Sequence, residues 1–389
     1  MSTPSRLQRV LGLPGSTIVG VSAMLGTGVF AVWTPAWQLA GPWLLVALLA
    51  AAAVAALNAT STARLARVHP ESGGAYAYGR IRVHRVAGLV AGYGFVIGKS
   101  ASAAAAALTI GAYVWPQHDR VIAWLALLLA LAIDLRGVTR SVRVSGVLVA
   151  IVTSILIVTI GLGLTAPPSG ASSSTPGSGV LACAAAAGLL FVAFAGYARL
   201  AVLGEEVRAP ERTIPRAMLA SFVIVSLVYF GVGVTILRFG ESGGVFTAAP
   251  LADVVLASGA PRFIDIVSVG AVLGAGAVLI SLIAGIGRTV FAMASRGDAP
   301  PSLAAISARR IPYRGSITAA VLAAVLILPG RLSWALALSA GTVLGYYVVA
   351  HLAAWSLGRR IVPALGILGC GALIGALALV AATGGLPGR

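Results

Sequence analysis

Two long stretches of this chain contain no charged side chain. Residues 10–63 and residues 144–198 hold no Asp, Glu, Lys or Arg, over 54 and 55 positions respectively. A helix that crosses the hydrocarbon core of a bilayer needs about 20 apolar residues, so each stretch is long enough for two crossings. The apolar runs do not alternate with polar residues as the strands of a membrane barrel do. Helices are then the structure that satisfies the backbone hydrogen bonds in lipid.

The same pattern continues along the rest of the chain, where apolar runs are separated by short segments that hold most of the arginines. It predicts eleven membrane-spanning helices, near residues 15–37, 43–63, 86–113, 121–135, 144–165, 180–203, 217–238, 264–293, 315–329, 333–357 and 361–383. The intervening polar segments are too short to form a separate domain. The sequence therefore predicts an all-α integral membrane protein whose function lies within its helices.

The composition agrees with this interpretation. The chain has 389 residues, of which 59% are hydrophobic and 10% are charged, and its formal net charge is +17. Soluble proteins have about 25% charged residues, so a soluble fold of this length is excluded. A large basic surplus otherwise suggests nucleic acid. Here the arginines lie between apolar runs, so we expect membrane lipid around the protein and no nucleic acid partner.

The placement of the arginines gives the orientation, because short cytoplasmic loops retain positive charge. With the N-terminus inside, the inner segments hold 20 of the 26 arginines and the outer segments hold 5. This distribution predicts a multi-pass protein of the cytoplasmic membrane. Its N-terminus would be cytoplasmic and, with eleven spans, its C-terminus would be outside.

Two of the predicted spans carry glycine near their middle. The first contains Gly26 and Gly28 on either side of Thr27, and the sixth contains Gly196 next to Tyr197. Glycine weakens a helix, and irregular backbone at membrane depth is tolerated only where it lines a cavity or packs against protein. Interrupted spans at corresponding positions of two repeats are typical of substrate sites in secondary transporters. The alternative is that these glycines only allow close helix packing.

A pair of interrupted helices suits one class of substrate. The N-terminus of a half-helix presents free N–H groups and a partial positive charge, which favour a carboxylate. The C-terminus of a half-helix presents free carbonyls, which favour an ammonium group. A zwitterionic α-amino acid carries both groups.

At this point the sequence resembles a known family, the amino acid–polyamine–organocation transporter superfamily. Four segments carry the resemblance: the glycine motif of residues 26–30, residues 194–217 with the run Gly204-Glu-Glu-Val-Arg-Ala-Pro210, residues 288–300, and residues 70–76. The resemblance implies a leucine-transporter-type fold of five plus five inverted spans, with spans one and six discontinuous. The first repeat would comprise residues 12–166, the second residues 180–358, and an additional span residues 361–383.

The resemblance also implies roles for particular residues. Alternating access would move an amino acid held between the two breaks. The substrate-binding residues carried over from the family are Gly26, Thr27 and Gly28 for the carboxylate, the carbonyls of Met24, Phe194 and Ala195 for the amino group, and Gly196 and Tyr197 beside them. Phe194 or Tyr197 would also act as an aromatic gate.

The sequence departs from the family pattern in three places. Residues 144–165 contain no lysine where many members have one that replaces a coupling sodium ion. Ala198 stands where some members have an acid. The hydropathy pattern predicts eleven spans where twelve are usual.

Lys99 is the single lysine of the chain and lies inside a predicted span. Ionisable residues inside the membrane are functional candidates by default, and a lysine, unlike an arginine, can release its proton. We therefore expect Lys99 to be the coupling residue, with protons as the coupling ion. The alternative is a lysine that only bonds carbonyls or reaches toward the membrane surface.

Arg199 lies near the end of the sixth predicted span, and Glu205 and Glu206 follow it. All three are expected to act in gating, as ion pairs that close the inner side. A cation near the pocket favours neutral amino acids over basic ones, and uptake would be proton-coupled or by exchange. Alternatives are a permease or exchanger for basic amino acids or polyamines, and a channel. The scattered acids and histidines indicate no enzyme, metal site or cofactor.

Overall fold

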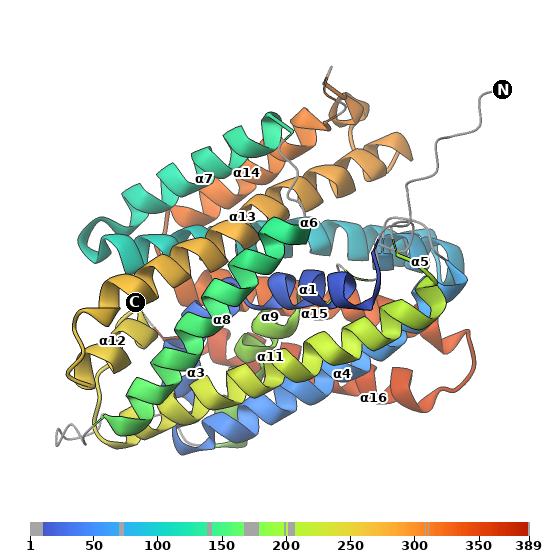
Figure 1. The fold of residues 1–389 in the computed structure, drawn as a ribbon. Helices are drawn as coiled ribbons and strands as arrows, with labels where there is room; N and C mark the ends of the chain where they lie inside the picture. The colour runs from blue at the N-terminus through green and yellow to red at the C-terminus, as the bar shows by residue number, and fades with distance from the viewer. Residues whose placement is uncertain are drawn as a thin grey trace.

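The computed structural model describes residues 11–69, 74–137, 142–166, 179–197, 200, 207–307, 309 and 311–387. Within these residues the chain forms a bundle of helices (Figure 1). The α-helices are α1 Leu13–Met24, α2 Thr27–Ala31, α3 Trp33–Ala40, α4 Leu44–Val68, α5 Gly74–Arg82, α6 Arg85–Val114, α7 Asp119–Leu135, α8 Val142–Thr165, α9 Val180–Phe194, α11 Pro210–Glu241, α12 Pro250–Ala257, α13 Phe263–Ser295, α14 Tyr313–Ile327, α15 Leu332–Trp355 and α16 Ile361–Ala382.

Every range that the hydropathy pattern predicts as a span contains helix. Eight helical segments are long and apolar enough to cross a membrane by length and composition, and α9 and α14 are shorter apolar helices. The range predicted at 217–238 begins earlier than expected, because α11 starts at Pro210 and continues through Pro215. Proline is well tolerated as the first residue of a helix, so the polar residues ahead of the apolar run join the same helix.

Two short helices lie outside the predicted spans. They occupy opposite ends of the bundle, with α5 at the right and α12 at the left in Figure 1. Gly74 begins α5 with a φ of 55°, in the left-handed region that favours glycine. Neither helix is apolar over a membrane-spanning length, so hydropathy gives no signal for them.

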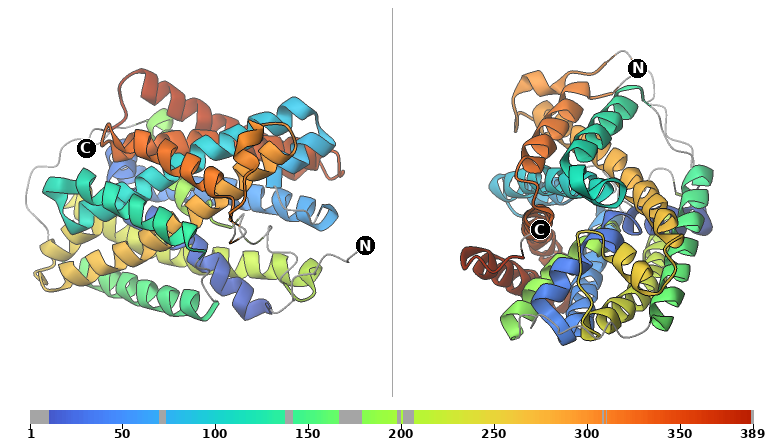
Figure 2. Two further views of the ribbon diagram at one scale, coloured as in Figure 1. Left: turned by 90° about the horizontal axis from the view of Figure 1, so that it is seen from above. Right: turned by 90° about the vertical axis from the view of Figure 1, so that its left-hand side faces the viewer.

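The core of the bundle is built around α6, which packs against α7, α13, α14 and α15. Both views of Figure 2 show the long helices running roughly along a common direction with α6 among them. A run of alanines from Ala103 to Ala107 is completely buried. Small side chains let helix backbones approach closely where lipid gives no hydrophobic drive to association.

Candidate substrate site at the broken helices

The first span is interrupted at Leu25 and Gly26. Helix α1 ends at Met24, and the Gly26 N–H turns back to donate to the Met24 carbonyl at 2.8 Å. The second half of the span begins at Thr27 with no side-chain cap on its N–H groups. A Cβ on Gly26 would collide with Val278 of α13. The glycine therefore allows the break to lie directly against that helix.

The half-helix that begins at Thr27 is longer than α2 alone. Val32 joins α2 to α3 with helical dihedral angles, and its N–H donates to the Gly28 carbonyl at 3.2 Å. The chain thus runs almost continuously as helix from Thr27 to Ala40. Its N-terminus is the end that faces the break.

The sixth span is interrupted at the predicted place. Helix α9 ends at Phe194, and Ala195 to Tyr197 form a turn. A Cβ on Gly196 would collide with the backbone of Ala23 and lie 2.8 Å from the nitrogen of Met24. The break of the sixth span therefore packs on the end of α1.

The contact between the two spans is reciprocal. Gly28, just beyond the first break, faces the backbone of Ala193, just before the second, with no room for a side chain. Each break thus contributes a glycine that touches the other span. The sequence predicts the two glycine clusters, and the structure brings them together.

Tyr229 of α11 joins the two half-helices and was not predicted from the sequence. Its hydroxyl donates to the Met24 carbonyl at 2.6 Å and lies 3.0 Å from the Ala193 carbonyl. The side chain is fully buried. A hydroxyl between two helix C-termini satisfies carbonyls that have no partner within their own helix. One tyrosine in an apolar span carries no sequence signal of this role.

The hydroxyl of Thr27 is a polar group left open at the break of the first span. Thr27 is 6% exposed, and its Oγ1 has no hydrogen-bond partner among the described residues. Buried hydroxyls are normally hydrogen-bonded. An open hydroxyl at the start of a half-helix is suited to a polar ligand.

The two predicted aromatic gates pack against different helices. The ring of Phe194 packs against Tyr229 and Phe222 of α11, with centroid distances of 5.0 and 5.5 Å. The ring of Tyr197 packs against Tyr347 of α15 at 5.6 Å. Both side chains are fully buried, so a gating movement of either ring requires these aromatic pairs to separate.

Lys99 lies near the middle of α6, fourteen residues after its start and fifteen before its end. It is half-buried, and the described residues offer it no hydrogen bond or ion pair. Its neighbour Gly98 packs against Thr342 and Val343 of α15. Lys99 therefore lies near the middle of a long apolar helix, next to a residue that packs against α15.

The predicted gating residues Arg199, Glu205 and Glu206 lie outside the described residues. The structure instead shows a network where the end of α5, the start of α6 and the end of α13 meet, which the sequence did not predict. The buried carboxylate of Asp298 pairs with Arg80 and with Arg85, the latter at 3.1 Å, and accepts a hydrogen bond from Tyr76 at 2.7 Å. Gly297 has a φ of 72°, which lets the chain reverse after α13 and bring Asp298 back to these helices.

A second contact joins the segments that flank the two interrupted spans. The Arg208 N–H donates to the Leu11 carbonyl at 2.8 Å, and Leu11 pairs with Val207 as an isolated bridge. These residues precede α1 and follow the sixth span. A backbone hydrogen bond thus joins the segment before α1 to the segment after the sixth span.

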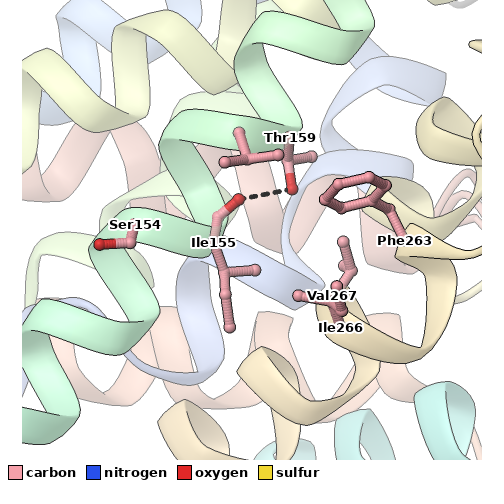
Figure 3. A pocket seen from close by; sticks show the side chains of 7 residues that line it. Ser154, Ile155, Thr159, Phe263, Ile266 and Val267 are labelled. Carbon is pink, nitrogen blue, oxygen red and sulfur yellow. Dashed lines mark hydrogen bonds between the residues drawn. The ribbon is translucent and has the colours of Figure 1, made fainter.

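A hollow between α8 and α13 is separate from the breaks (Figure 3). None of the predicted site residues lines it. Its lining is apolar apart from Ser154 and Thr159, and the Thr159 hydroxyl already donates to the Ile155 carbonyl at 2.8 Å. We do not assign a substrate to it.

Helices interrupted at paired positions and packed break against break define a membrane transporter of the leucine-transporter type. A solved structure of a Na+-coupled sialic acid symporter in a substrate-bound outward-open state has the same fold. The TM-score is 0.60 at 12% identity, over 96% of this chain and 90% of the other.

The chain belongs to the amino acid permease family, whose model matches residues 15–358. It is 39% identical to an uncharacterized transporter of Mycobacterium tuberculosis, over 98% of this chain and 89% of the relative. It is 25% identical to a branched-chain amino acid permease of Lactococcus lactis, over 90% of this chain and 86% of the relative. The resemblance found in the sequence is thereby confirmed.

Proposed function

We propose that the protein moves neutral amino acids across the cytoplasmic membrane by alternating access, with the substrate held between the breaks of the first and sixth spans. The reciprocal packing of Gly28 on Ala193 and of Gly196 on Ala23 carries this proposal. It joins the start of one half-helix to the ends of two others. The inverted repeats at 12–166 and 180–358 are the two proposed halves of the transporter.

The polar groups at the breaks match the two ends of an amino acid. We assign the substrate carboxylate to the open hydroxyl of Thr27 and to the uncapped N–H groups of the half-helix that begins there. The carbonyls of Met24, Phe194 and Ala195 are placed for the ammonium group. Met24 already accepts hydrogen bonds from Tyr229 and Gly26, so the ammonium group replaces one of these donors when it binds there.

The distribution of acids supports a neutral substrate. The acids of the described residues lie at helix ends or in the segments between the long helices: Asp119, Asp134, Glu211, Glu241, Asp253, Asp265 and Asp298. None of them is available at mid-depth to balance a cationic side chain. An unbalanced charge in such a place costs several kcal/mol. The matches to branched-chain amino acid permeases of Bacillus subtilis and Lactococcus lactis support the same assignment.

Lys99 is the proposed coupling residue. Among the described residues it is the charged side chain farthest from both ends of a long helix, and it has no described partner to fix its charge. A lysine in this setting can take up and release a proton during the cycle. Proton-coupled uptake and exchange both fit this role, and the inner ion pairs would keep the cytoplasmic side closed.

Uptake of labelled amino acids into proteoliposomes under an imposed proton gradient tests the proposal. We expect concentrative uptake of neutral amino acids, and a Thr27→Ala variant that raises KM at least tenfold because a hydrogen bond to a charged carboxylate is lost. Thr159→Ala is the matched control, since that hydroxyl bonds only within its own helix. Uptake of basic amino acids or polyamines alone would reject the neutral substrate, and uptake that never exceeds equilibrium would indicate a channel.

A further inference from the structure

Four arginines from three segments meet at the inner ends of α4, α5 and α15. Arg64 of α4 donates to the Gly358 carbonyl at 2.6 Å and to the Arg359 carbonyl at 3.2 Å. Arg82 of α5 donates to the hydroxyl of Ser356 at 3.0 Å. Arg359 and Arg360 follow in the same turn, between α15 and α16. We refer to Arg64, Arg82, Arg359 and Arg360 as the arginine corner.

No described carboxylate balances the arginine corner. The salt bridges found among the described residues both go to Asp298, from Arg80 and Arg85. The donors of Arg64 and Arg82 reach only neutral acceptors, and the side chains of Arg359 and Arg360 are exposed. Concentrated charge of one sign raises the local potential and attracts an oppositely charged ligand.

The turn that carries Arg359 and Arg360 is held in an unusual shape. Gly358 and Arg359 both have positive φ, of 74° and 50°. A residue with a Cβ is strained in this region. The two hydrogen bonds from Arg64 end on the carbonyls of these same two residues, so they stabilise the turn. The exposed guanidinium groups of Arg359 and Arg360 are therefore carried by a turn that is hydrogen-bonded to α4.

Apolar surface continues directly from the cations. The Arg360 guanidinium lies 5.8 Å from the ring centre of Trp355, which is itself partly exposed. Ile361, Leu365 and Leu368 are 76%, 50% and 69% exposed on α16. Their spacing places them on one helix face. Tryptophan favours the boundary between headgroups and hydrocarbon, so the cations lie at headgroup level and the leucines at the level of acyl chains.

We propose that the arginine corner binds an anionic phospholipid, with its phosphate on Arg359 and Arg360 and its acyl chains along the exposed face of α16. Basic pockets at the ends of membrane helices bind such headgroups. The adjoining apolar face distinguishes a phospholipid from free phosphate. The bound lipid would link α16 to α4 and α15 on the inner side.

Quenching of Trp355 by brominated lipids tests this site. The protein is reconstituted in phosphatidylcholine vesicles with equal fractions of brominated phosphatidylglycerol or brominated phosphatidylcholine, and the Trp355 emission is obtained by difference from Trp355→Phe. We expect stronger quenching by the brominated phosphatidylglycerol. An Arg359→Gln/Arg360→Gln variant should weaken its binding about fivefold per arginine, as expected from about 1 kcal/mol for each basic side chain near the surface.

Arg136→Gln/Arg288→Gln is the control, because it removes the same charge from two exposed positions outside the corner. It should keep the preference for the anionic lipid. Equal quenching by the two lipids, or the same loss in the control, would overturn the proposal. Native mass spectrometry of the unaltered protein is an independent measurement, in which phosphatidylglycerol should be retained over phosphatidylcholine, and equal retention would also overturn it.

Discussion

Asp298 and Lys99 are two charged side chains in opposite surroundings. The carboxylate of Asp298 is fully buried beside α5 and α6, with two arginines and a tyrosine on its oxygens. Lys99 is half-buried in the middle of α6 and has no described partner. A charge held by several groups cannot change without breaking them, and a charge without partners can. The comparison separates a charge held by its partners from the charge that we propose to act in transport.

The largest effect is expected at the paired charge. Asp298→Asn leaves Arg80 and Arg85 without a counter-charge, and removing one partner of a buried pair destabilises strongly. We expect about 3 kcal/mol of stability to be lost, at the low end for buried pairs because Arg85 is largely exposed. The thermal unfolding midpoint in detergent measures it. Asp265→Asn, at an exposed acid of α13, is the control, and an equal loss there would contradict the assigned role of the network.

Removing the unpaired charge of Lys99 should affect transport and not stability. Lys99→Met removes no described hydrogen bond, so the unfolding midpoint should change little while proton-driven accumulation is lost and exchange remains. Lys99→Arg should lose the pH dependence as well, because arginine keeps its proton. Uptake in proteoliposomes as a function of internal and external pH checks both variants. If uptake in Lys99→Met still depends on pH, the coupling proton binds elsewhere.

A neutral hydroxyl with two possible acceptors should have an intermediate effect. Tyr229→Phe removes the donor to the carbonyls of Met24 and Ala193 without changing the aromatic packing. The expected loss is about 1 to 2 kcal/mol, typical of leaving a buried carbonyl unsatisfied. Unfolding in detergent and KM for uptake are the measurements. Tyr313→Phe is the control, because that hydroxyl only accepts from exposed Arg314, and a loss of the same size there would remove the case for Tyr229.

Asp253 of α12 lies between the two extremes, with hydrogen bonds but no cation. It accepts hydrogen bonds from the backbone and hydroxyl of Thr247, whose carbonyl accepts from Thr34 of the first span. Burial raises the pKa of Asp253 from 3.8 to about 6, although the Thr247 hydrogen bonds oppose this shift. The folded protein therefore binds this proton more tightly than the unfolded chain does.

The sign of the pH dependence follows from this difference. Stability should fall as pH rises from 3.8 towards about 6, where the folded protein gives up a proton that the unfolded chain has already lost. Unfolding midpoints across this pH range, compared with Asp253→Asn, measure it. The variant should lack this part of the slope, and an unchanged slope would assign it to other groups.

The sequence predicted most of the fold because each apolar run has to be long enough for a bilayer. It also predicted where the first and sixth spans break, since Gly26 and Gly196 interrupt otherwise apolar runs. It missed α5 and α12, because both helices are short and the residues on either side of them do not extend an apolar run. The number of membrane crossings, their orientation and the repeat boundaries stay predictions.

The site was predictable only in its backbone part. Glycine motifs mark irregular backbone, and both breaks lie where these motifs are. Tyr229 and Asp298 were missed because each acts on groups far away in the chain: Tyr229 and Met24 are 205 positions apart, and Asp298 and Tyr76 are 222 positions apart. The sequence around a single tyrosine or aspartate does not predict a partner so far away in the chain.

The sequence by itself determined that this protein is a bundle of membrane helices, that two of these helices are interrupted, and that one long apolar helix contains a lysine. Those features depend on local composition, which fixes how a segment partitions into lipid and whether it stays helical. The tertiary structure alone decided which polar groups are satisfied. The partners of Asp298 and of the Met24 carbonyl, and the absence of a described partner for Lys99, depend on how distant helices pack, and packing is a property of the whole chain.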